Sequence, residues 1–166
     1  MSRSLFVCSV RELGEERVSE LILACVVKFQ PTWMTIDAYG RPAPSVDFVR
    51  AELEKLSGRR GPSGVLIDPA DARAVGLFAT YAPYSADVEV GMSVPGDPLL
   101  VVYDGETVGT TISPEVIRQL VPALSSARWE ELEEQPSLWD RWRRHVASRR
   151  NTRDGSETSD REAPRP

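Results

Sequence analysis

The sequence predicts an α+β domain, with a mostly antiparallel β-sheet, helices packed on one face and a C-terminal helical segment. Three observations predict this class. Strand and helix signals alternate over the first sixty residues, the apolar period changes to two from residue 65, and helix signals return after residue 112. The 166-residue length suits a single domain. We expect that domain to cover residues 1–147 and to precede a disordered polar tail over 148–166.

The N-terminal part is predicted to contain two strands and two helices. The segment LFVCSV (5–10) is typical of an opening strand, and WMTIDAYG (33–40) is typical of a short strand that Gly40 ends. Between them, residues 14–29 have apolar side chains at helical spacing on more than one face, which predicts a helix central to the core. Ser45 is placed to cap a second helix.

A meander of about four strands is predicted over 76–111. The first strand is GLFATYA (76–82), and the next is DVEVGMSV (87–94), in which apolar residues alternate with polar ones as in a half-exposed antiparallel strand. In LLVVYDGETVGTT (99–111), the Asp-Gly pair predicts a hairpin, because a type I′ turn requires two residues of positive φ.

Helix signals fill the remainder of the chain. Ser113-Pro114-Glu115 is a typical helix start, and Pro122 is expected to break that helix. A further helix is predicted in ARWEELEEQ (127–135). In SLWDRWRRHVASRR (137–150), Trp139 and Trp142 belong to one apolar stripe, so this segment is predicted to be a closing helix. The pattern leaves open whether the two tryptophans are buried or contact a partner.

Composition excludes several classes of protein. The net charge of −5 disfavours general binding to nucleic acid or to anionic membranes. The longest apolar run has seven residues, far fewer than the ~20 that span a bilayer. The N-terminus lacks the apolar core of a signal peptide, so a cytoplasmic location is predicted. Cys8 and Cys25 have no disulfide or zinc spacing and are expected to be buried free thiols. We expect no metal and no cofactor.

No sequence motif of a known catalytic class is present, and His145 is the only histidine. In LIDPADARAVG, Asp68 at the N-cap and Asp71 at N3 are predicted to start a short helix. The alternative function is a small hydrolase or nucleotide-processing enzyme that uses the carboxylates of Asp37 and Asp68. The roles of Asp37 and His145 stay open.

Charge distribution favours a binding function. Residues 61–127 contain two basic and eight acidic residues, which would attract a basic protein partner unless the acids form only a solvated face. Aromatic residues on a rigid turn are good contact surfaces. The predicted contact residues are Tyr81, Tyr84, Asp87, Glu89 and Glu106. The oligomeric state and the partner's identity are not predicted.

The segments FQPTWMTIDAYGR, AVGLFATYAPYSADVEVGMSVP and SPEVIRQLVPALSSARW give the chain a resemblance to a family. Over about residues 5–130 it resembles the small α+β immunity proteins of bacterial polymorphic-toxin systems. The resemblance implies a non-enzymatic bacterial protein that binds and neutralises a cognate toxin, often a basic nuclease. It transfers no individual residue, and the Asp-Gly hairpin and the C-terminal helix have no counterpart in it.

Overall fold

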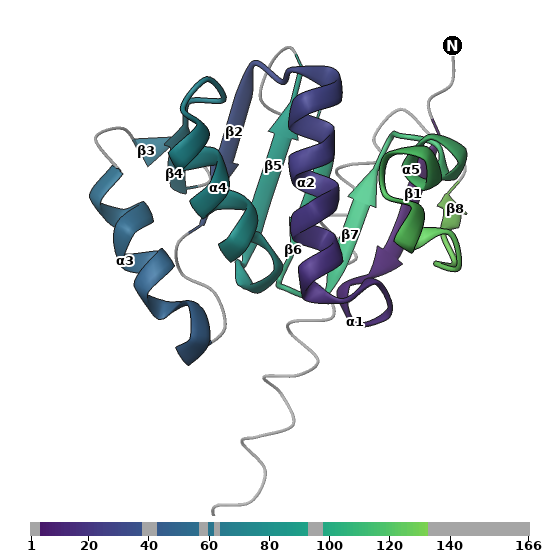
Figure 1. Cartoon of the computed structure of the whole chain (residues 1–166), viewed down its shortest axis with the longest axis horizontal. Helices are drawn as coiled ribbons and strands as arrows, with labels where there is room; N and C mark the ends of the chain where they lie inside the picture. Colours follow the sequence, from purple (N-terminus) through teal and green to yellow (C-terminus); the bar gives the residue numbers. More distant parts are fainter. Residues whose placement is uncertain (1–3, 38–42, 57–59, 62–63, 93–97, 133–166) are drawn as a thin grey trace, which may run out of the picture. The chain divides into compact units, whose positions relative to one another are not determined.

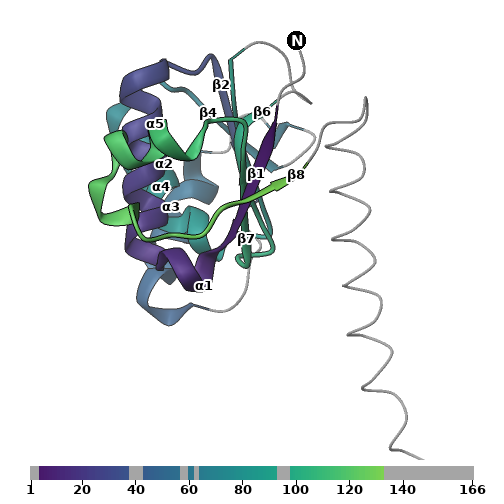
Figure 2. The same ribbon diagram turned by 90° about the vertical axis from the view of Figure 1, so that its right-hand side faces the viewer.

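The computed structural model describes residues 4–37, 43–56, 60–61, 64–92 and 98–132. These residues form one antiparallel sheet of eight strands in the order β3-β4-β2-β5-β6-β7-β1-β8. The α-helices that they contain cover one face of that sheet, as the two orthogonal views show (Figures 1 and 2). The predicted α+β class, with a mostly antiparallel sheet and helices on one face, is therefore confirmed.

The strands are short and belong to the compact unit Met1–Glu133. They are β1 (Leu5–Ser9), β2 (Trp33–Ile36), β3 (Arg60–Gly61), β4 (Gly64–Ile67), β5 (Asp87–Gly91), β6 (Pro98–Tyr103), β7 (Thr107–Thr110) and β8 (Glu130–Leu132). The helices are α1 (Val10–Leu13), α2 (Glu15–Phe29), α3 (Asp47–Leu56), α4 (Ala72–Tyr81) and α5 (Pro114–Leu120). Three 3₁₀ turns are η1 (Pro44–Val46), η2 (Ala82–Tyr84) and η3 (Pro122–Leu124).

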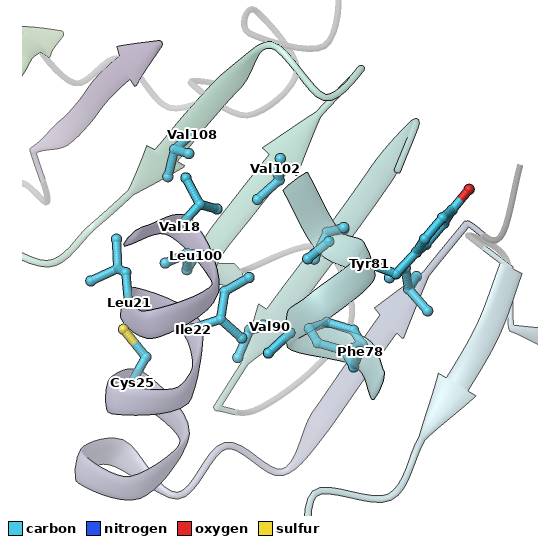
Figure 3. Close-up of a cluster of buried hydrophobic side chains, with 14 of the residues drawn as sticks. Val18, Leu21, Ile22, Cys25, Phe78, Tyr81, Val90, Leu100, Val102 and Val108 are labelled. Carbon is cyan, nitrogen blue, oxygen red and sulfur yellow. The ribbon is translucent and has the colours of Figure 1, made fainter. Parts of the chain in front are cut away.

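The core lies between the helices and the sheet. Helix α2 supplies its central row of apolar side chains, and Phe78 of α4 packs beside them (Figure 3). On the sheet side, Val88 and Val90 of β5 meet Leu100 and Val102 of β6. These contacts confirm the prediction that the helix over 14–29 is central to the core. Within the described part of the chain, no helix is long and apolar enough to cross a membrane.

Several local predictions are confirmed. The Ser113 hydroxyl accepts a hydrogen bond from the N–H of Val116 at the start of α5, and that helix ends before Pro122. Asp104 and Gly105 both have positive φ, 53° and 60°, in the turn between β6 and β7. The segment that Ser45 was expected to cap begins instead with the turn η1, and α3 follows from Asp47.

The strand predicted over 76–82 is wrong, because these residues belong to α4 and η2. The Asp71 carboxylate accepts hydrogen bonds from the N–H groups of Arg73 and Ala74, which fixes the first turn of a helix. Ala74 and Phe78 are then buried one helical turn apart, between α2 and α3. The meander over 76–111 therefore has three strands, β5 to β7, in the described residues.

The helix predicted over 127–135 is also wrong in its described part. Glu130–Leu132 forms β8, which pairs with the free edge of β1. The approach to β8 is held by the Glu12 carboxylate, which accepts a 2.7 Å hydrogen bond from the N–H of Arg128. Pairing with β1 satisfies backbone groups of that strand, and this outweighs the helix propensity of the glutamates. The helix predicted over 137–150 and the tail over 148–166 lie outside the described residues.

Candidate functional site

The face of the sheet opposite the helices carries its own set of side chains. The register of six strand pairs places one row of residues across seven strands of this face. In spatial order the row is Leu66, Thr35, Glu89, Val101, Gly109, Val7 and Glu130. We call this side of the sheet the helix-free face, in reference to the described helices (Figure 2).

Burial on the helix-free face is deep near its centre. Thr35 and Glu89 are each 4% exposed, although a threonine and a glutamate at strand positions are more often solvated. Val101 and Trp33 are similarly buried on the same face. The expectation that Glu89 lies on a half-exposed strand face is therefore wrong. The alternation in 87–91 correctly places the Glu89 side chain on the face opposite the helices. Alternation shows only which side of the sheet a residue faces, and it does not show whether that side is buried.

Trp33 and Gly91 are register partners on β2 and β5. The indole lies so closely over Gly91 that a Cβ atom at position 91 would overlap the ring. A glycine is therefore required here for space, and the indole is fixed across two strands. Glu89 is two residues from Gly91 along β5 and faces the same side of the sheet, so Trp33 and Glu89 occupy diagonal positions in the ladder.

Two polar atoms on this face have no hydrogen-bond partner. They are the indole nitrogen Nε1 of Trp33 and the hydroxyl Oγ1 of Thr35, and both atoms are buried. Buried polar groups are nearly always paired, and an unpaired one costs about 1–3 kcal/mol. Thr35 is the register partner of Glu89, so the two residues are directly opposite each other on this face. We call Trp33, Thr35 and Glu89 the β2–β5 cluster.

Two further acidic residues extend the helix-free face at one end. The N–H of Asp37 donates a 2.8 Å hydrogen bond to the backbone oxygen of Asp87, which joins the ends of β2 and β5. The buried Ser85 hydroxyl donates to the backbone oxygen of Asp37 at 2.6 Å and so supports the same junction. Asp37 and Asp87 are half-buried. Tyr103 is the register partner of Asp87 and adds a phenol beside it.

The five predicted contact residues do not form one surface. Tyr81 is 1% exposed and belongs to the core (Figure 3), so its prediction as a contact residue is wrong. It was placed on a strand turn, whereas α4 directs its ring inward. Tyr84 is half-buried and packs against the core on the helix side of the sheet.

The hydroxyl of Tyr84 donates a 2.7 Å hydrogen bond to a carboxylate oxygen of Glu15. This bond ties η2 to the first turn of α2, so Tyr84 has a structural role. Glu106 is exposed, and it follows the β6–β7 turn at the same end of the sheet as Asp87. Of the predicted set, Asp87, Glu89 and Glu106 thus remain together. Trp139 and Trp142, the predicted contact helix, lie outside the described residues, as does His145.

The carboxylates of the alternative enzyme hypothesis do not converge. Asp37 follows β2 and Asp68 follows β4, and these antiparallel strands pair Ile36 with Val65 and Met34 with Ile67. The two aspartates therefore lie at opposite ends of the ladder, about 13 Å apart at ~3.3 Å per residue. The predicted capping roles are also corrected. Asp71 is the N-cap of α4, and Asp68 accepts from the N–H of Ala70 in the preceding turn.

Neither cysteine thiol is activated as a nucleophile. Burial raises the pKa of Cys25 to about 12. Burial, with the nearby Glu12 charge, raises the pKa of Cys8 to about 11. Thiolate is the nucleophilic form, so neither thiol is activated. The two cysteines are free and buried, as predicted. Among the described residues, no group of three His, Cys, Asp or Glu side chains is arranged to hold a metal ion.

Sequence reasoning missed the β2–β5 cluster. A signal was present in WMTI, where Trp33 and Thr35 alternate with two core residues and so had to share the other face. The glycine opposite Trp33 could not be paired with it before the strand register was determined. No family model, curated protein or solved structure matches the chain. The resemblance to immunity proteins therefore rests on the sequence pattern alone.

Proposed function

We propose that the chain is a non-enzymatic binding domain that neutralises or regulates a basic protein partner, as an immunity-protein-like antitoxin would. One observation carries this proposal: in seven of the eight strands, all but the short β3 with its Arg60, every charged residue is acidic. Strands β1, β2 and β4 to β8 contain four acidic residues and no Lys or Arg. Asp87 and Glu89 lie on the helix-free face, as does Glu130.

A surface of one sign favours a partner of the opposite sign in two ways. It accelerates the encounter through long-range attraction, and it disfavours nucleic acid and other acidic partners. Asp37 and Asp87 at one end of the helix-free face, with Glu106 nearby, supply the more accessible charges.

The partner is first to be isolated by capture on the full chain from the native host and identified by mass spectrometry. The association rate is then measured for the double variant D87N/E106Q. The matched control is E16Q/E20Q, which removes the same charge from exposed positions on α2. We expect the first variant to slow association about tenfold at low salt, less at high salt, and the control to leave it nearly unchanged.

Two results would contradict the proposal. One is capture of no basic protein in stoichiometric amount. The other is an equal effect of the two double variants, which would show that net charge matters and the helix-free face does not. A co-expression assay adds a functional readout, because an antitoxin should restore growth to cells that express the captured partner. Turnover of nucleotides by the purified chain would favour the enzyme hypothesis instead.

A further inference from the structure

We infer that helix α2 is a self-association surface, on which the chain packs against α2 of a second copy in an antiparallel arrangement. The contact is centred on an exposed apolar stripe, Leu23 and Val27, which lie one helical turn apart. The inference goes beyond the proposed function, because α2 belongs to the helix layer and the helix-free face is on the other side of the sheet (Figure 2).

The apolar stripe is the second apolar side of α2. The side toward the sheet buries four residues completely, namely Val18, Leu21, Ile22 and Cys25 (Figure 3). On the outer side, Val27 is 79% exposed and Leu23 is 41% exposed. A helix that is apolar on both sides is usually covered on both. Helices α4 and α5 lie on either side of α2 and leave the stripe uncovered (Figure 1).

A row of residues beside the stripe favours a second copy of the same helix as the occupant. Glu20, Ala24 and Lys28 follow one another at intervals of four residues, so they share one side of α2. Each charge is about 6 Å from Ala24 along the helix axis, in opposite directions. A two-fold axis at Ala24, perpendicular to the helix, therefore places Glu20 of each copy beside Lys28 of the other. The row is complementary to itself when the two helices are antiparallel, and like charges meet when they are parallel.

The residues of this row are available for such a contact. Glu20 and Lys28 are exposed, and neither forms an ion pair with another residue that the structure describes. Ala24 at the axis has a small side chain, so it does not hold the two helices apart. Rows at four-residue spacing are also the ridges that interdigitate in the commonest class of helix packing.

The size of the patch determines the strength of the dimer. Its apolar centre consists of Leu23 and Val27 from each copy, whereas a stable interface buries about 800 Å² on each partner. Exposed ion pairs add little to affinity, although they select the orientation. We therefore expect a reversible dimer with a dissociation constant on the order of 10⁻⁴ M. Such a dimer does not cover the helix-free face of either copy.

Sedimentation velocity of the full chain, from about 10 µM to about 1 mM, measures the association. Wild type should change from monomer toward dimer over this range. V27D places a charge in the apolar centre and should weaken the dimer about tenfold or more. The matched control is F48D, because Phe48 is an apolar residue 68% exposed on α3 of the same helix layer, and this variant should dimerise as wild type does. Circular dichroism verifies that each variant folds.

Charge reversal tests the antiparallel arrangement. E20K and K28E should each weaken the dimer about tenfold at low salt, because like charges then meet at both ends of the contact. The double variant E20K/K28E exchanges the two charges and should recover the wild-type affinity. A parallel pair of helices predicts no loss in either single variant, since its facing charges are alike before and after the change. High salt should reduce the effects of charge reversal and leave that of V27D.

Three results would overturn the inference. The first is a full chain that stays monomeric up to about 1 mM. The second is an equal effect of V27D and F48D, which would place the contact elsewhere or attribute it to added charge. The third is normal dimerisation of E20K and K28E, or no recovery in the double variant. A monomeric chain that still captures a basic protein would refute this interface and leave the proposed function standing.

Discussion

The indole of Trp33 occupies the space that a side chain at Gly91 would need, and this contact joins β2 to β5 on the helix-free face. The relationship is steric, because the φ of Gly91 is not in the positive region that favours glycine. Replacing this glycine therefore tests packing, separately from backbone conformation.

Gly91→Ala should destabilise the domain by about 1–3 kcal/mol, the usual cost of overpacking a well-filled interior. Gly76→Ala is the matched control. Position 76 lies inside α4 with open space for a Cβ atom, so the same change should stabilise by about 0.5–1 kcal/mol. Urea unfolding of both variants gives the two free energies. If both substitutions stabilise the domain, the indole does not occupy the space over Gly91.

Asp71→Ala should cost about 1 kcal/mol in unfolding free energy, because Asp71 accepts two N–H groups at the start of α4. Asp68→Ala should cost less than ~0.5 kcal/mol, since Asp68 is exposed and accepts a bond only within the preceding turn. Asp71→Asn should recover most of the loss. Thermal unfolding followed by circular dichroism distinguishes the two aspartates. A larger loss of stability for Asp68→Ala than for Asp71→Ala would support the prediction from the sequence that Asp68 is the N-cap.

Tyr84→Phe should lower the free energy of unfolding by about 1–2 kcal/mol, because it leaves the half-buried Glu15 carboxylate without its 2.7 Å donor. A double-mutant cycle with Glu15→Gln should give a coupling energy of the same order. The association rate with a basic partner should not change. A rate that falls while the coupling is near zero would show that Tyr84 acts as a contact residue after all.

Alkaline pH should destabilise the protein in part through Cys25. Burial raises the pKa of its thiol in the folded protein to about 12, above the ordinary thiol value of 9.0 that applies when the chain is unfolded. The resulting stability is complete below pH 9 and is lost as the pH rises toward 12, at up to about 1.4 kcal/mol per pH unit. Unfolding of wild type and Cys25→Ala between pH 9 and 10.5 should show the weaker pH dependence in the variant. Parallel pH dependences would contradict this assignment.

The sequence predicted the elements whose local signals agree with their tertiary setting. Helix α2 has an apolar face, and α5 has a cap, a proline and a first-turn acid at its start. Prediction from the sequence failed where two local signals favoured different secondary structures. The segment 76–82 has aromatic and β-branched neighbours typical of a strand, but the cap at Asp71 and the packing of Phe78 produce a helix.

Predictions also failed where the deciding partner is distant in the sequence. Glu130–Leu132 becomes a strand because β1, more than 120 residues earlier, offers an open edge. The β2–β5 cluster depends in the same way on pairing across more than fifty residues. Alternation placed Glu89 on the correct side of the sheet, but a pattern of period two contains no information on what buries that side.

The position of β1 between β7 and β8 determines when the sheet can be completed during synthesis. Strand β1 is made before both of its pairing partners, Thr107–Thr110 and Glu130–Leu132, which lie near the end of the described chain. Until those residues emerge, an apolar strand with two open edges is exposed to other chains, and such edges promote aggregation. Pairings of such large sequence separation are also slow to form. The sheet can therefore close around β1 only after the residues of β7 and β8 have been made.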